Sequence, residues 1–399
     1  MRIVIGGGGV AGLEAALALR DLAGHQVGID LVAPQRSFLD RPATVVEPFG
    51  NTAAGRFPVS DILAGSDIQH HLDAVAWIDR FHREAHTRSG RTLRYGGLLL
   101  CPGARAQPAY PHAITVSGTP QDPALAEVIA DLDAGAARRV AFVVPGAGSW
   151  QLPLYELALL TAARARERGL QVALTIFTPE RLPMEAFGEH AGSAASALLA
   201  GAGIELVCRA ACRVPDSHSL LVDTAETTDW PRTRPHRREQ PLTFDRILAL
   251  PRLRGPRIRG VPAISDGFIP VDLHGRILGA KTEFAAGDAT NCPVKHGSVA
   301  AQQADAAAAM LAVIAGADVR PVPFHPVARG VLLTGAESRR LSASIVGGHS
   351  VRSEFAGTGA TVADKLDARY LSPRLDALRA AGRPGLSRRQ ISDDTGARK

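Results

Sequence analysis

The sequence has few cysteines, few aromatic residues and no long apolar run. Its four cysteines, Cys101, Cys208, Cys212 and Cys292, include no C-x-x-C pair and no spacing typical of zinc ligands. We therefore expect reduced thiols, a cytoplasmic location and no metal site. No run of about eighteen apolar residues occurs, which argues against a membrane-spanning helix and leaves peripheral attachment to a membrane open.

The charge pattern excludes one class of partner. The 399 residues carry a formal net charge of +6, but aromatics make up only 5% of the chain and no basic stripe with interleaved aromatic residues occurs. We therefore expect no nucleic-acid partner. A hydrophobic content of 46% with 21% charged residues is typical of a globular protein, and the length allows two or three domains.

The glycine-rich beginning of the chain is its most specific motif. Residues 2–5 predict a β-strand, and a helix is predicted from Ala11 to Leu19. Between them Gly7, Gly9 and Gly12 form G-x-G-x-x-G. In dinucleotide-binding units these glycines allow a tight turn, the approach of a pyrophosphate, and close packing of helix on strand. The motif therefore predicts a dinucleotide site at the helix N-terminus.

Further strands are predicted at residues 26–32, 69–79 and 95–104, and an ordered loop at 37–58. We expect cofactor contacts in or next to these segments, at Pro34, Arg41, Val75 and Gly103.

Ala33 stands where such units usually carry an acid that holds a ribose hydroxyl. Either the backbone and Gln35 replace that acid, or Asp30 does so in a shifted register. We favour the first alternative, because Asp30 falls inside the alternating strand.

A second unit repeats this plan about 140 residues later. It comprises a strand at 140–144, a glycine turn, a helix at 155–168 and a strand at 171–177. These elements predict an α/β fold with two Rossmann-like domains, the second inserted in the first. We place the first domain at residues 1–115 and 262–325 and the second at 116–261. A C-terminal α+β interface region at 326–399 ends in a tail, from 382, that we expect to fray.

The second glycine turn is degraded. Gln151 stands in the place of the third glycine, and Thr178 stands where an acid would select NAD. Gly146, Gly148 and Glu156 form the candidate NAD(P) site. The alternative is that the second domain keeps the fold and has lost the ligand.

Four stretches, in this order, resemble one family. They are the first glycine motif with Glu14, L-L-L-C-P-G-A at 98–104, F-A-A-G-D-A at 284–289, and P-V-K-H-G-S at 293–298 followed by A-A-Q-Q. Together they are similar to the FAD/NAD(P) pyridine nucleotide oxidoreductases with two dinucleotide-binding domains. Within that family the chain resembles the branch of type II NADH dehydrogenases and sulfide:quinone oxidoreductases. The resemblance covers residues 1–325.

The resemblance implies FAD bound in an extended form. Its pyrophosphate would lie over Gly9 to Gly12, with Val10 and Ala11 included. Asp288, after Gly287, would hold a hydroxyl group of the cofactor. Gly297 would present helix N–H groups to the N1/O2 edge of the flavin, where a reduced flavin carries negative charge.

Two residues are candidates for catalytic positions under the same resemblance. Lys295 would lie beside the flavin and raise its reduction potential, with a solvated loop lysine as the alternative. Gln302 would line a quinone pocket, with a functionless glutamine on the helix surface as the alternative. The sequence identifies no proton donor.

One departure concerns the electron donor. Sulfide-oxidising members carry a redox cysteine in a pattern like S-C-x-G-P-x-Y-E, and this chain reads S-W-Q-L-P-L-Y-E at 149–156. Trp150 replaces the thiol, which disfavours sulfide oxidation through a cysteine pair.

We therefore expect an FAD-dependent oxidoreductase that passes electrons from NAD(P)H to a quinone or small acceptor. The alternatives are a cysteine-independent sulfide:quinone reaction and a non-catalytic FAD-binding sensor. The oligomeric state, a homodimer included, stays open.

Overall fold

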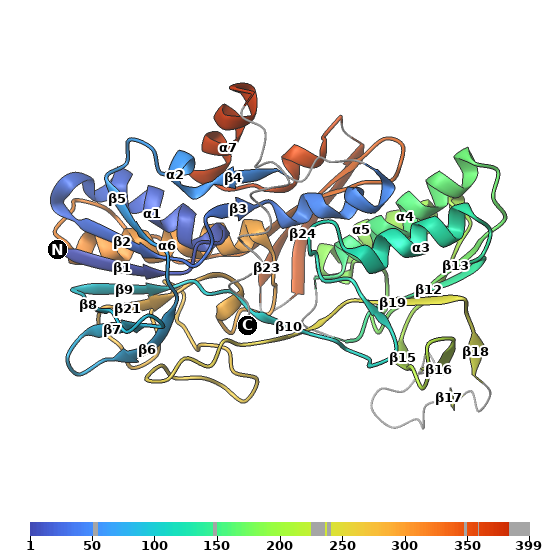
Figure 1. Cartoon of the computed structure of the whole chain (residues 1–399), viewed down its shortest axis with the longest axis horizontal. Helices are drawn as coiled ribbons and strands as arrows, with labels where there is room; N and C mark the ends of the chain where they lie inside the picture. Colours follow the sequence, from blue (N-terminus) through green and yellow to red (C-terminus); the bar gives the residue numbers. More distant parts are fainter. Residues whose placement is uncertain are drawn as a thin grey trace.

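The computed structural model describes residues 1–50, 55–146, 150–224, 236–237, 241–346, 349–357 and 359–382, with the backbone alone at 236, 237 and 349. Gly148 and the predicted tail beyond 382 lie outside these ranges. The molecule is elongated, with two sheets following one another along its long axis (Figure 1).

The first sheet is parallel and has the strand order β21-β9-β1-β2-β5. Its strands are β1 (Arg2–Gly6), β2 (Gly28–Val32), β5 (Ile68–His71), β9 (Gly97–Leu100) and β21 (Glu283–Ala285). Ile3 and Ile5 pack against α1 (Val10–Ala23) and α6 (Gly297–Ile314). Val4 packs against the meander β6 (Val75–Asp79), β7 (Glu84–Thr87) and β8 (Thr92–Arg94). The sheet is therefore buried on both faces.

The second sheet is also parallel, in the order β11-β19-β12-β13-β14. Its strands are β11 (Ile114–Thr115), β12 (Arg139–Val143), β13 (Ala173–Phe177), β14 (Ile204–Val207) and β19 (Arg246–Ala249). One face packs on α3 (Pro123–Asp133), α4 (Leu152–Glu167) and α5 (Gly188–Gly201). The other face packs on β15 (Ala210–Arg213) and β16 (Ser219–Thr224), which β17 (His236–Arg237) and β18 (Leu242–Thr243) extend.

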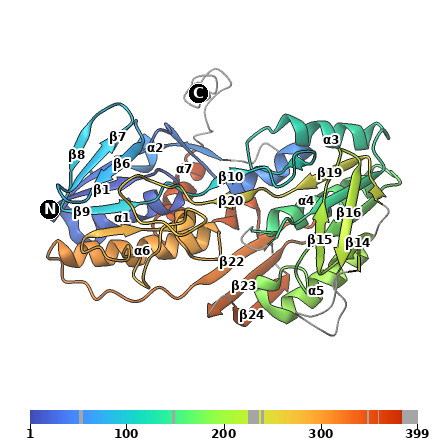
Figure 2. The ribbon, with the colours of Figure 1, turned by 90° about the horizontal axis from the view of Figure 1, so that it is seen from below.

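Two antiparallel strands connect the halves. β10 (Arg105–Gln107) pairs with β20 (Arg252–Arg254), and both run between the two sheets (Figure 2). The chain leaves the first sheet after β9 and returns to it with β21.

The C-terminal region bridges the two halves. An antiparallel sheet of β22 (Val327–Leu332), β23 (Arg339–Val346) and β24 (His349–Gly357) contacts α6 through β22 and α5 through β24. The helix α7 (Leu371–Ala380) then packs on α1 and on α2 (Val59–Ile62). The short hairpin of β3 (Ser37–Leu39) and β4 (Arg56–Pro58) and the 3-10 helix Arg41–Phe49 lie within the predicted loop at 37–58.

The predicted fold class, α/β with Rossmann-like units, is confirmed. The single strand predicted at 69–79 is wrong, because β5 and β6 belong to different sheets. The break falls at Asp73, whose carboxylate accepts the N–H of Ala74 at 2.7 Å and that of Ser89 at 3.3 Å and so stabilises a turn.

The domain boundaries stay a prediction. β11, at the end of the predicted first segment, pairs in the second sheet. Within the described ranges no helix combines the length and the hydropathy that a bilayer span requires.

Candidate functional site

The first glycine turn combines two closed positions with one open position. A Cβ on Gly7, at φ +123°, would overlap the carbonyl oxygen of Cys101, and a Cβ on Gly12 would overlap that of Gly7. Gly9, the N-cap of α1, has no neighbouring atom within 4 Å of its Cβ position. The fold therefore requires glycine at Gly7 and Gly12, whereas Gly9 leaves open space at the helix N-terminus.

A second glycine corner lies against this turn. Gly287 follows β21 at φ +75°, and its Cβ position is 3.1 Å from the Cβ of Ala11 and 3.3 Å from that of Ala300. The N–H of Gly287 donates to the side-chain oxygen of Gln303 at 2.8 Å. The N-termini of α1 and α6 and the Gly287 corner are thus held together at one edge of the first sheet.

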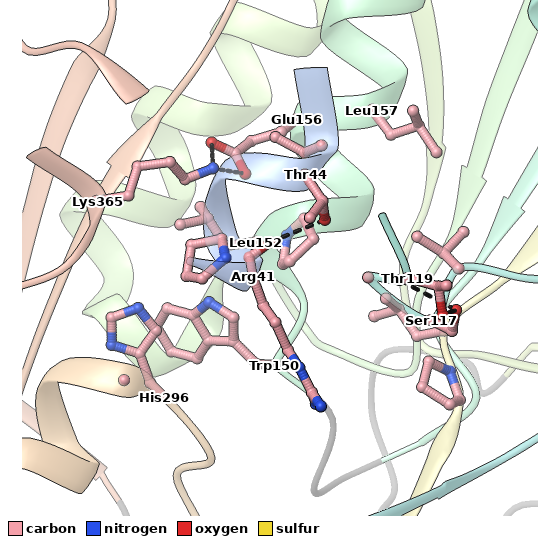
Figure 3. A pocket seen from close by; sticks show the side chains of 18 of the residues that line it. Arg41, Thr44, Ser117, Thr119, Trp150, Leu152, Glu156, Leu157, His296 and Lys365 are labelled. Carbon is pink, nitrogen blue, oxygen red and sulfur yellow. Dashed lines mark hydrogen bonds and ion pairs between the residues drawn. The ribbon is translucent and has the colours of Figure 1, made fainter. Parts of the chain in front are cut away.

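A cavity of about 280 Å³ opens at this edge, between the two halves and the C-terminal region (Figure 3). The first half contributes Val10, Arg41, Asp288, Lys295 and Gly297 to its lining. The opposite wall is mostly apolar, and it includes Val116, Leu125, Trp150, Leu152, Pro153, Leu157, Leu250 and Val331. Candidate residues that are distant in the sequence therefore meet around one space.

Asp288 is a carboxylate without a hydrogen-bond partner among the described residues. Burial raises its pKa, although the charges of Lys295 and Arg41 act in the opposite direction. The cavity is where this side chain can find a donor.

Lys295 is a buried cation and not a solvated loop lysine. The residue is 7% exposed, and its Nζ donates to the carbonyl of Thr290 and lies 3.9 Å from the centroid of the Phe268 ring. Burial lowers its pKa to about 8, against the opposing effect of the Asp288 charge.

Trp150 and His296 form an aromatic part of the wall that the sequence did not assign to the cavity. Their ring centroids are 4.2 Å apart, and Phe187 meets Trp150 edge-on at 5.3 Å. His296 caps α6, its Nδ1 lying 2.7 Å from the Oγ of Ser298. Burial lowers the pKa of His296 to about 3, so that the ring is neutral at physiological pH.

Glu156, a candidate from the sequence, forms a buried ion pair with Lys365 (Figure 3). The Nζ of Lys365 lies 2.5 Å and 2.7 Å from the two carboxylate oxygens, and the N–H of Leu333 donates to one of them at 3.0 Å. Both charged residues line the cavity. Lys365 carries no motif signal, and the pairing across 209 residues could not be found from the sequence.

Gln302 lies off the cavity lining. Its amide donates to the carbonyls of Ser298 and Val327 and accepts the N–H of Val327. The side chain therefore ties β22 to α6.

Eight predicted FAD contacts also lie outside the cavity lining: Gly7, Gly9, Ala11, Gly12, Pro34, Val75, Gly103 and Gly287. Val75 approaches the Cβ position of Gly6 at the end of β1. The carboxylate of Asp30 is already hydrogen-bonded to Arg2 and His71. Burial opposes its ionisation, but these two bonds outweigh that effect and lower its pKa.

The four cysteines are free thiols. Burial raises the pKa of Cys101 and of Cys212 to about 12, and it also raises the pKa of Cys208 and Cys292. None is therefore a ready thiolate at neutral pH.

The second unit aligns with the first in a register that the sequence missed. The N-cap of α1 is Gly9 and that of α4 is Gln151, and Glu14 and Glu156 are each the fifth residue of their helix. The counterpart of Gly12 is therefore Leu154, and the prediction that Gln151 occupies the third glycine position is wrong. Gly146 has the expected positive φ, at +139°.

Comparisons with known proteins agree with this architecture. Residues 1–309 match the family model described as pyridine nucleotide-disulphide oxidoreductase. The sulfide:quinone oxidoreductase of Aquifex aeolicus superposes with a TM-score of 0.76 at 18% identity, over 90% of this chain and 87% of that chain. A ferredoxin reductase of Rhodopseudomonas palustris superposes with a TM-score of 0.60 at 20% identity, over 87% of this chain and 83% of that chain. A NAD-dependent persulfide reductase of A. fulgidus superposes with a TM-score of 0.60 at 14% identity, over 98% of this chain and 79% of that chain.

At these identities the solved structures establish a shared fold, and no curated protein matches the sequence. The family model, in contrast, spans most of the chain, including both glycine corners of the cavity. The chain therefore belongs to the pyridine nucleotide-disulphide oxidoreductase family and is a flavin-dependent oxidoreductase.

Proposed function

We propose that the chain uses FAD to pass electrons from a reduced donor to a quinone or another small acceptor. One observation carries the proposal: the glycine turn of α1 and the Gly287–Asp288 corner lie side by side, and each contributes one residue, Val10 or Asp288, to the cavity lining. A dinucleotide needs both, because its pyrophosphate requires free N–H groups and its hydroxyl groups require an acceptor.

The residues at this edge fit FAD. The N–H groups of Val10, Ala11 and Gly12 have no acceptor among the described residues, and Gly9 leaves space beside them. A hydroxyl group of the cofactor would supply the donor that Asp288 lacks. When bound, FAD supplies the electron exchange that amino-acid side chains cannot perform.

Two cavity residues would tune that exchange. Gly297 begins α6, whose N-terminus favours negative charge, and Lys295 adds a positive charge held in place by Thr290. Both features would stabilise a reduced, anionic ligand. The apolar opposite wall supports a quinone or similar ring compound as the acceptor.

The Asp288→Asn variant tests the FAD site. We expect its FAD affinity to fall about 10- to 100-fold, because a hydrogen bond to a charged group contributes roughly 1.5–3 kcal/mol. The apoprotein should keep its thermal stability, since Asp288 bonds to no described residue. Asp67→Asn, at an exposed carboxylate, is the matched control. Equal FAD affinity in both variants, measured by titration of the apoprotein, would contradict the proposal.

The donor is identified with the loaded protein. Anaerobic mixing with NADH, NADPH and sulfide in turn, followed through flavin absorbance, distinguishes nucleotide from sulfur donors. If neither these donors nor photochemical reduction bleach the bound flavin, the proposal of an oxidoreductase gives way to that of a non-catalytic FAD-binding sensor.

A further inference from the structure

The turn before α4 differs in length from the turn before α1. Two residues, Gly7 and Gly8, separate the end of β1 from the N-cap Gly9. Seven residues, 144–150, separate the end of β12 from the N-cap Gln151. A dinucleotide site depends on a tight turn that brings the strand end and the helix N-terminus to the same pyrophosphate. The second unit lacks this short connection.

The start of α4 also offers few hydrogen-bond donors. Its second residue is Pro153, which has no N–H, and the N–H of Leu154 already donates to the carbonyl of Gln151 at 3.0 Å. The three corresponding N–H groups of α1 have no acceptor among the described residues. The anion site that a pyrophosphate requires is therefore weak at α4.

Apolar packing covers the same helix start. Leu154, the counterpart of Gly12, is fully buried. Gly330 of β22 lies against the start of α4, because a Cβ on Gly330 would be 3.0 Å from the Cδ2 of Leu152 and 3.8 Å from the Cζ2 of Trp150. The start of α4 thus packs against the C-terminal sheet, where a nucleotide-binding unit has an open groove.

The acid near the tip of β13 is not available to a ribose. Glu180 is buried and accepts the hydroxyl of Tyr155 at 2.7 Å and that of Thr178 at 2.8 Å. Its other oxygen accepts the N–H of Glu185 at 2.9 Å. A nicotinamide nucleotide would have to displace a satisfied buried network at this strand end.

We infer that the second unit does not bind NAD(P)H, and that α4 instead forms the apolar wall of a site for a small, largely apolar substrate without phosphate groups. Trp150, Leu152, Pro153 and Leu157 present that wall to the cavity. The inference rests on the proposed function, since the same cavity would hold the reacting end of FAD. It excludes NAD(P)H, the donor predicted from the sequence, from the second unit and assigns the start of α4 to the site of the acceptor, a compound with the size and polarity of a quinone or another small aromatic molecule.

Binding is tested in apoprotein and FAD-loaded protein with two kinds of probe. Isothermal titration with NADH, NADPH and ADP-ribose should give no saturable binding up to about 1 mM. Menadione, a quinone without a tail, should bind and quench Trp150 fluorescence. Trp150→Ala should weaken menadione binding about tenfold, and Trp150→Phe should keep the affinity within about threefold, because it retains an aromatic ring. Trp77→Phe, in the meander, is the control.

The outcomes separate the inference from the proposed function. ADP-ribose or NADH binding with a Kd below about 100 µM, or rapid bleaching of the flavin by NADH, would overturn the inference while leaving the flavoprotein intact. Menadione that binds Trp150→Ala as well as it binds the parent protein would overturn the apolar wall. A chain that takes up no FAD would refute the proposed function, whatever the titrations on the apoprotein give.

Discussion

At the scale of single residues, the glycines of the first turn have different tasks. Gly12→Ala should prevent correct folding or cost several kcal/mol, because its Cβ would overlap the Gly7 carbonyl. Gly9→Trp should fold, since its Cβ position is open and its φ of −83° suits any residue, but it should yield colourless protein because the indole would fill the pyrophosphate space. Circular dichroism and the flavin absorbance of purified protein measure the two effects. Normal flavin content in Gly9→Trp would contradict the assigned pyrophosphate position.

The same residues mark how far a sequence can predict a site. Gly7, Gly9, Gly12, Gly287 and Asp288 sit in spaced motifs whose backbone requirements are local, and the structure brings them to one edge of the sheet. Lys365 and His296 could not be assigned, because their places depend on pairing and packing across distant segments. The register of α4 was missed for a related reason: a longer turn moves the helix start, and no local residue type records that shift.

At the scale of elements, the Glu156–Lys365 pair joins α4 to the C-terminal region. Both side chains are buried, so removing one partner leaves an uncompensated charge. Lys365→Met should cost about 3–5 kcal/mol in the free energy of unfolding, and adding Glu156→Gln should restore much of that loss. Denaturant unfolding of the single and double variants measures the coupling. A double variant no more stable than Lys365→Met would mean that the residues act independently.

The carboxyl groups of Glu14 and Asp305 link α1, α6 and α7. Glu14 accepts the N–H groups of Tyr370 and Leu371, at 2.8 Å and 2.6 Å, and lies next to Asp305 of α6. Burial, and secondly the charge of Glu14, raises the pKa of Asp305 from 3.8 to about 7, while Arg369 opposes the shift. The folded state therefore binds more protons than the unfolded state between these two values.

The sign of the resulting pH dependence follows from that difference. The contribution of Asp305 to stability is complete below pH 3.8 and is lost as the pH rises through about 7. A shift of one pKa unit corresponds to about 1.4 kcal/mol in the free energy of unfolding. Because Asp305 is partly exposed, we expect its whole contribution to stability to be about 2 kcal/mol. Asp305→Asn should flatten this part of the stability profile between about pH 4 and pH 7, measured by denaturant unfolding at several pH values. An unchanged slope would exclude Asp305 as its source.

At the scale of the whole molecule, continuous apolar strands made the architecture predictable. Apolar strands with glycine turns after them identified both Rossmann-like units, and the fold class required no knowledge of long-range contacts. The bridging role of the C-terminal sheet was less accessible, because β22 is held by the amide of Gln302 and by the carboxylate of Glu156 just beyond its end. Gln302, which the resemblance places in a quinone pocket, also takes part in that bridge.

Because the cavity lies where the two halves and the C-terminal region meet, FAD binding should stabilise all three parts together. At a free FAD concentration 100 times the Kd, linkage predicts about 2.7 kcal/mol of added stability. Differential scanning calorimetry should therefore show a higher Tm with FAD and no shift for Gly9→Trp. If the second sheet and the C-terminal region unfolded in a separate transition unaffected by FAD, FAD binding would not stabilise the cavity wall that these two parts form. A single transition that moves as a whole would instead mean that Trp150, Glu156 and Lys365 are ordered together with the FAD edge.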